Sequence, residues 1–142
     1  WEDLKRILSY TDLAFIDCKC MNREKHKVLT GVSNEIILQN IVMTAQWCEE
    51  HGKQLIIRLP LIPTLNEDDK NLRDTAEFVK KLSGKPLLNV LPYHNFGASK
   101  YETIGKRYPT EDLQSQESED LQRMKNILKE TGVRFSIGGY DI

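Results

Sequence analysis

Four ionisable residues lie at or just beyond the ends of short apolar segments, where their side chains could form one binding site. They are Asp17, Lys19, Arg58 and His94. A carboxylate, an ammonium, a guanidinium and an imidazole that converge would suit a polar, charged ligand, because each charge could meet an opposite one. Burying such groups without partners costs free energy, so a plain core is a poor place for all four. We therefore predict a shared site for a charged ligand.

The alternation of side chains along a strand predicts which residues accompany these four. Successive side chains of a strand point to opposite faces of the sheet, so the remaining apolar residues would form the face packed under helices. In parallel α/β folds, ligands bind at the carboxyl ends of the strands, which is where the ionisable groups lie. The predicted rows are Leu13, Phe15, Asp17 and Lys19; Gln54, Ile56, Arg58 and Pro60; and Leu88, Val90, Pro92 and His94.

Strand and helix patterns alternate along the chain. Apolar runs predict strands at 13–19, 55–61, 87–92 and 133–137, and helical spacing predicts helices at 1–8, 33–52, 66–84 and 117–131. Ser33 or Asn34 is expected to cap the second helix and Asn66 the third, while 21–31 and 93–108 are expected to be loops. This order predicts an α/β fold of parallel β/α units in a single domain, residues 1–142.

Two closures of such a sheet are possible, an open doubly wound sheet and an arc of a (β/α) barrel. A complete eight-stranded barrel takes about 200 residues or more, so this chain could form only part of one.

The composition excludes several classes of protein. The chain has 142 residues, with 20 basic and 21 acidic side chains and a net charge of −1, which gives no electrostatic footprint for nucleic acid. The longest apolar stretch, 55–63, contains Arg58 and is far too short to span a membrane, and no signal-peptide pattern is visible. Cys18, Cys20 and Cys48 lack the spacing of a metal site, and their odd number fits a reducing cytoplasm.

Several motifs follow one another in a fixed order along nearly the whole chain. They are Asp17-Cys18-Lys19, Met21-Asn22, His26, Leu29-Thr30-Gly31-Val32-Ser33-Asn34, Ile57-Arg58-Leu59-Pro60-Leu61-Ile62-Pro63, Asn66, Leu91-Pro92-Tyr93-His94, Gly97, Lys100-Tyr101, Gly105 and Ile137-Gly138-Gly139. Together they resemble the middle and end of the glycyl-radical enzyme activating enzymes, of which pyruvate formate-lyase activating enzyme is the best-known member. Because the motifs are collinear, the resemblance is specific.

The resemblance implies a radical S-adenosylmethionine (radical SAM) enzyme built on a partial (β/α) barrel. In that family a [4Fe-4S] cluster held by a CxxxCxxC motif cleaves S-adenosylmethionine, and the resulting radical removes a hydrogen from a glycine loop of a partner glycyl-radical enzyme. Carried over by position, Asp17 and Lys19 match a DxK motif near S-adenosylmethionine and a monovalent cation. His94 matches a histidine that contacts S-adenosylmethionine. Arg58 matches an arginine that lines the same cleft and faces either the cofactor or the glycine loop of the substrate.

The sequence departs from the family in one respect, because it contains no CxxxCxxC motif. The chain begins at Trp1, inside a helical pattern, so we expect residues 1–142 to be the C-terminal half of an activating enzyme without its cluster-binding half. On this interpretation no cofactor is expected to be bound to the chain itself, which would be inactive alone. Two alternatives stay open: a cluster-free α/β scaffold, and a complete small doubly wound domain that binds a small ligand or a protein.

The cysteine pattern yields a prediction about metal content. The purified chain should contain no iron–sulfur cluster, because its three cysteines are not spaced to hold one. Iron and sulfide assays test this, and both elements at cluster stoichiometry would contradict it.

A half barrel also predicts self-association. The strand at 13–19 would lose its neighbour on one side, leaving an edge that could pair with another chain. Sedimentation at high concentration should show a dimer or a larger species, and a monomer throughout would argue against the expectation.

Overall fold

The computed structural model describes residues 1–139 as one β-sheet flanked by helices. The strands are β1 (Leu13–Asp17), β2 (Gln54–Pro60), β3 (Leu87–Leu91) and β4 (Phe135–Ile137). The helices are α1 (Glu2–Leu8), α2 (Arg23–Thr30), α3 (Glu35–Glu50), α4 (Asp69–Lys80), α5 (Ala98–Thr103) and α6 (Ser118–Thr131). The predicted strands and the long helices α3, α4 and α6 are therefore confirmed in type and in order.

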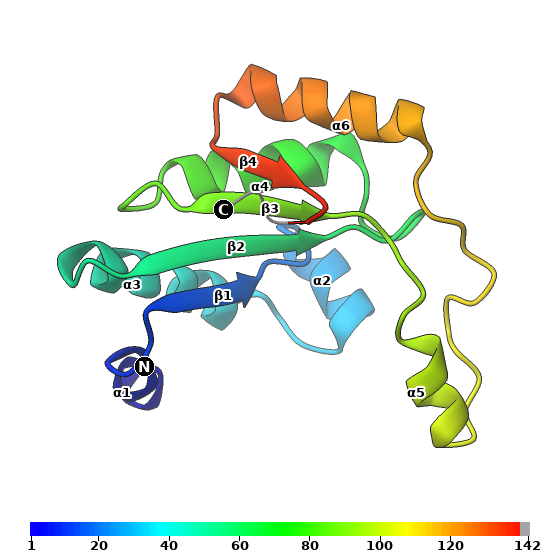
Figure 1. The fold of residues 1–142 in the computed structure, drawn as a ribbon, viewed down its shortest axis with the longest axis horizontal. Helices are drawn as coiled ribbons and strands as arrows, with labels where there is room; N and C mark the ends of the chain where they lie inside the picture. Colours follow the sequence, from blue (N-terminus) through cyan, green and yellow to red (C-terminus); the bar gives the residue numbers. More distant parts are fainter. Residues whose placement is uncertain (140–142) are drawn as a thin grey trace.

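All pairs of neighbouring strands are parallel, and their order in the sheet is β1-β2-β3-β4. The arrowheads in Figure 1 accordingly point the same way, toward the side on which α2 and α5 lie. A doubly wound sheet reverses its strand order at a switch point, and the described sheet has no reversal. Right-handed crossovers in one direction place successive helices on the same face, as in a barrel. The fold is thus parallel α/β, and its order favours the barrel arc over the doubly wound alternative.

One face of the sheet packs under the helices. Ile57, Leu59, Leu88 and Val90 are all fully buried in a cluster with residues of α3, α4 and α6. Ile41 of α3, Leu72 and Val79 of α4, and Leu128 of α6 are their fully buried partners. Burial of this apolar face determines, in each strand, which side chains point toward the helices. The predicted rows of the first two strands are confirmed.

The predicted row of the third strand is wrong. The expectation placed Leu88 and Val90 in the row that leads to His94, on the face away from the helices, but both lie on the helix-covered face. Instead, Asn89 is in register with Arg58. The physical reason is that a strand with apolar residues on both faces shows no alternation in its sequence. Which of its side chains face the helices is then decided by how it pairs with the neighbouring strands.

Two predicted loops contain helices. Segment 21–31 forms α2, whose first turn is capped by Asn22, the acceptor of a 2.9 Å hydrogen bond from the Lys25 amide. It ends at Gly31 with φ of +83°, a conformation that favours glycine. Segment 93–108 contains α5. Both helices are short and polar, so neither produces a long apolar stripe that would reveal it.

The capping residue of α4 was also predicted wrongly. Asp68 caps this helix by accepting from the Asn71 amide at 2.9 Å, whereas the expected cap, Asn66, is buried in the loop before it. Within residues 1–139, no helix combines the length and the hydropathy needed to cross a bilayer.

Candidate functional site

A row of polar residues crosses the sheet on the face opposite the core. Strand register aligns Asp17 of β1 with Arg58 of β2, Arg58 with Asn89 of β3, and Asn89 with Ser136 of β4. Residues in register on neighbouring strands share a face, so one polar residue from each strand contributes to this polar row. The layer next to it, toward the amino ends of the strands, is apolar, with Phe15, Ile56 and Leu87 in register. The polar row therefore lies toward the carboxyl ends.

Asp17 is the centre of the charged half of the polar row. Arg58 Nε donates to Asp17 Oδ1 at 2.7 Å, and Lys19 Nζ lies 3.7 Å from Asp17 Oδ2. The side chains of Asp17 and Arg58 are about one-third exposed, at 32% and 36%, so water still reaches the pair. The Arg58 guanidinium also lies over the Phe15 ring, 5.6 Å from its centroid, a cation–π contact. Asp17 therefore contacts two cationic side chains, one on each carboxylate oxygen.

Asn89 forms the uncharged half of the polar row together with Ser136. Its side chain is fully buried, and Asn89 Nδ2 donates to Ser136 Oγ at 2.8 Å and to the Gly138 carbonyl at 3.0 Å. Asn89 Oδ1 is buried and has no hydrogen-bond partner among the described residues. An unsatisfied buried acceptor costs about 1–3 kcal/mol, so this oxygen is suited to a donor that arrives with a ligand.

Ion pairs join three of the four predicted residues, Asp17, Lys19 and Arg58, and among the described residues none joins His94 to them. His94 is exposed and stacks on Phe96, with ring centroids 4.3 Å apart. It lies beyond the end of β3, in the segment that leads to α5. Figure 1 shows α5 standing away from the sheet. The predicted convergence of His94 with Asp17 therefore stays a prediction. Strand alternation does not extend into a segment that has left the sheet.

The three cysteines are buried free thiols. Burial, helped by the nearby Cys20 and Asp17, raises the pKa of Cys18 to about 12, and burial also raises the pKa of Cys20 and of Cys48. The Cys18 thiol lies 3.6 Å from the Met21 sulfur. Thiols kept protonated in this way are poor nucleophiles and poor metal ligands. Within residues 1–139, no cluster of three or more His, Cys, Asp or Glu side chains is arranged to hold a metal ion.

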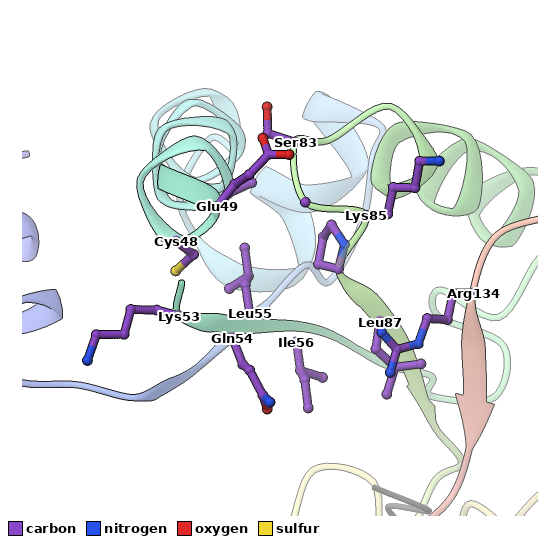
Figure 2. A pocket seen from close by; sticks show the side chains of 13 residues that line it. Cys48, Glu49, Lys53, Gln54, Leu55, Ile56, Ser83, Lys85, Leu87 and Arg134 are labelled. Carbon is purple, nitrogen blue, oxygen red and sulfur yellow. The ribbon is translucent and has the colours of Figure 1, made fainter. Parts of the chain in front are cut away.

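A cavity of about 380 Å³ lies at the opposite ends of the strands, beside the first residues of β2 and β3. Its lining includes Lys53, Lys85 and Arg134, which would suggest an anion site. Figure 2 shows, however, that the amines of Lys53 and Lys85 point away from one another. Lys53 is also paired with Asp12 at 2.6 Å. Cations that diverge cannot share one anion, so the polar row is the better candidate.

Sequence reasoning missed Asn89 and Ser136. The usable signal was weak: Asn89 is the single polar residue in the strand sequence LLNVL, and Ser136 is the single one in FSI. A lone polar residue in an otherwise buried strand has to be hydrogen-bonded or functional, and Asn89 satisfies only part of its capacity.

Several known proteins that are similar to this chain in sequence are activating enzymes. Trans-4-hydroxy-L-proline dehydratase activating enzyme of Clostridioides difficile is 36% identical over 140 residues, 97% of this chain and 45% of that protein. Indoleacetate decarboxylase activating enzyme of Tractidigestivibacter scatoligenes is 32% identical, over 96% of this chain and 42% of that protein. Among solved structures, a domain of pyruvate-formate lyase-activating enzyme from Bacteroides vulgatus ATCC 8482 matches with a TM-score of 0.73 and 31% identity. The match covers 97% of this chain and 74% of that one. No protein-family model matches the chain.

The extent of these matches, together with the parallel sheet, shows the family. The chain belongs to the glycyl-radical enzyme activating enzymes, which confirms the resemblance in the sequence. It spans less than half the length of the two curated relatives, at 45% and 42%.

The Asp17–Arg58 pair should be energetically coupled. A double-mutant cycle of Asp17→Asn and Arg58→Met, measured by urea unfolding, should give a coupling free energy of about 1 kcal/mol. The reason is that a charge-assisted hydrogen bond that is partly shielded from water is stronger than an ion pair between exposed groups. The Lys53–Asp12 pair, whose carboxylate is 95% exposed, is the matched control and should couple more weakly. Equal coupling in both cycles would contradict the expectation.

Proposed function

We propose that this chain is the C-terminal half of a radical SAM activating enzyme, and that its polar row holds the methionine end of S-adenosylmethionine. The carrying observation is the in-register polar row of Asp17, Arg58, Asn89 and Ser136 on the face left open by the helices. The membership of the family and the share of its relatives' length that the chain spans support the proposal.

The residues of the row fit an aminocarboxylate. Arg58 and Lys19 are donors suited to a carboxylate, and Asp17 and the unpaired Asn89 Oδ1 are acceptors suited to an ammonium or hydroxyl group. A ligand carrying both charges can exchange partners with the Asp17–Arg58 pair, so each charged group keeps a partner of opposite charge. When bound beside a cluster, S-adenosylmethionine supplies radical chemistry at a carbon–sulfur bond.

The cysteines do not fit a [4Fe-4S] cluster. Cluster ligands are thiolates, whereas burial raises the pKa of Cys18, Cys20 and Cys48. Cys18 and Cys20 also lie at and beyond the end of β1, while Cys48 lies on α3. In the proposed enzyme the cluster is held outside this chain, by the other half.

The neighbours of Asp17 do not favour a monovalent cation there. Its two carboxylate oxygens face Arg58 and Lys19, and an added metal cation would be repelled by both. A role for His94 toward S-adenosylmethionine stays a prediction, because it requires the segment after β3 to approach the open face.

Within the proposed enzyme, this chain's side chains bind and orient rather than transfer protons. Arg58 and Lys19 hold the ligand's carboxylate, and Asp17 keeps both cations directed at it. The apolar layer behind the row, with Ile56 and Leu87 buried, restricts water beneath the ligand. The open side, where Phe15 is 39% exposed, is where we propose that the glycine loop of a glycyl-radical enzyme approaches.

The proposal is tested in the longer protein that contains this sequence, reconstituted anaerobically with iron and sulfide. Reduction in the presence of S-adenosylmethionine should release 5′-deoxyadenosine, and Arg58→Gln should lower kcat/KM by about 10²-fold, since a lost charged contact costs about 3 kcal/mol. Arg134→Gln, in the cavity at the far ends of the strands, is the matched control and should leave the rate unchanged. No 5′-deoxyadenosine from the wild-type protein would favour the cluster-free scaffold.

A further inference from the structure

Three buried asparagines surround the backbone that follows β1. Asn34, Asn66 and Asn71 are 3%, 3% and 4% exposed. They come from different places in the sequence: the residue before α3, the loop after β2, and the first turn of α4. All three side chains bond to residues 19–21, which we call the Lys19–Met21 segment. This segment directly follows the strand that carries Asp17.

Asn66 joins the Lys19–Met21 segment to the end of β2. Its Nδ2 donates to the Lys19 carbonyl at 2.7 Å and to the Pro60 carbonyl at 2.8 Å, and its Oδ1 accepts from the Ile62 amide at 2.6 Å. These three bonds use both hydrogens of the amide and one oxygen lone pair. The backbone position of Lys19 is thereby fixed relative to the strand that carries Arg58.

Asn71 and Asn34 hold the other end of the segment. Asn71 Oδ1 accepts from the Met21 amide at 2.9 Å, and Asn71 Nδ2 donates to the Asn66 carbonyl at 2.8 Å, so the two asparagines are also linked. Asn34 Nδ2 donates to the carbonyls of Cys20 and Met21, each at 2.9 Å. The side chain of Asn34 makes no capping bond to α3, although it stands at the cap position.

The geometry of the segment depends on these side chains. The Lys19–Met21 segment lies outside the strand and outside α2, so neither ladder nor helix bonds hold its carbonyls. Buried backbone groups need partners, and three asparagine side chains supply them. Leaving such a group unpaired costs about 1–3 kcal/mol, enough to favour another path for the segment. Lys19 would then leave its place 3.7 Å from Asp17.

We propose that Asn34, Asn66 and Asn71 are positioning residues of the ligand site, acting through the Lys19–Met21 segment to place the Lys19 ammonium beside Asp17 and Arg58. This inference rests on the proposed function for its ligand. It predicts that loss of an asparagine side chain weakens ligand binding, whereas loss of a residue with a purely structural role lowers stability alone.

The first measurement needs no ligand and uses the 142-residue chain. Asn34→Ala removes only the two bonds to Cys20 and Met21, so Cys20, itself 1% exposed, reports local opening. Its alkylation rate, followed by mass spectrometry on the native protein, should rise about tenfold, as expected for about 1.4 kcal/mol of lost local stability. Cys48, a buried residue of α3 itself, should keep its alkylation rate. If the Asn34→Ala protein fails to fold, Asn71→Ala provides an independent variant.

Thr131→Val is the matched control. It removes a buried hydroxyl that donates to the Leu128 carbonyl at 2.7 Å at the end of α6, away from the segment. It should lower overall stability by a similar amount without raising the Cys20 rate relative to that of Cys48. The proposal would be overturned if Asn34→Ala raised the ratio of the Cys20 rate to the Cys48 rate by no more than Thr131→Val does.

The second measurement separates positioning from stability in the longer, cluster-loaded protein. Asn34→Ala should raise the KM for S-adenosylmethionine about tenfold and change kcat by less than about threefold, since it weakens binding rather than chemistry. Selective Cys20 exposure with an unchanged KM would overturn the proposal. A wild-type protein that forms no 5′-deoxyadenosine would contradict the proposed function instead, and the alkylation rates would still decide whether the asparagines hold the segment.

Discussion

The site depends on one ion pair between neighbouring strands. Arg58 and Asp17 are in register on β2 and β1 and share a 2.7 Å hydrogen bond on the side of the sheet that the helices leave open. A charge on the helix-covered side would have no partner among the apolar residues there. The pair therefore identifies the face on which polar chemistry is possible, and Lys19, Asn89 and Ser136 extend the same face in both directions.

The asymmetry of the two sheet faces follows from the order of the strands. Parallel strands that follow one another without reversal keep their connecting helices on one side, so the other side has to be filled by layers of side chains or by a ligand. Phe15, Ile56 and Leu87 form an apolar layer, and Asp17, Arg58, Asn89 and Ser136 form a polar one. A sheet face with an apolar layer beside a polar one is suited to a ligand that has both an apolar and a zwitterionic part.

The sequence was sufficient where one face of a strand differed clearly from the other. The charged residues at 17, 19 and 58 interrupt an apolar alternation, so their common face could be predicted before any coordinates were known. The strand LLNVL has no such contrast, and only its register with β2 reveals that Asn89 belongs to the polar row. Alternation cannot place His94, because it lies outside the strand, where the path of the chain depends on tertiary contacts. The buried asparagines could not be assigned either, because their partners in the Lys19–Met21 segment are 13 to 52 residues away along the chain.

The most direct test of the central claim is a crystal structure of the longer protein with its cluster and S-adenosylmethionine bound. Our account predicts the aminocarboxylate of the ligand within hydrogen-bonding distance of Arg58 or Lys19, on the face that carries Asn89. A ligand bound at the other ends of the strands, near Lys85 and Arg134, or one that leaves the polar row unoccupied, would contradict it.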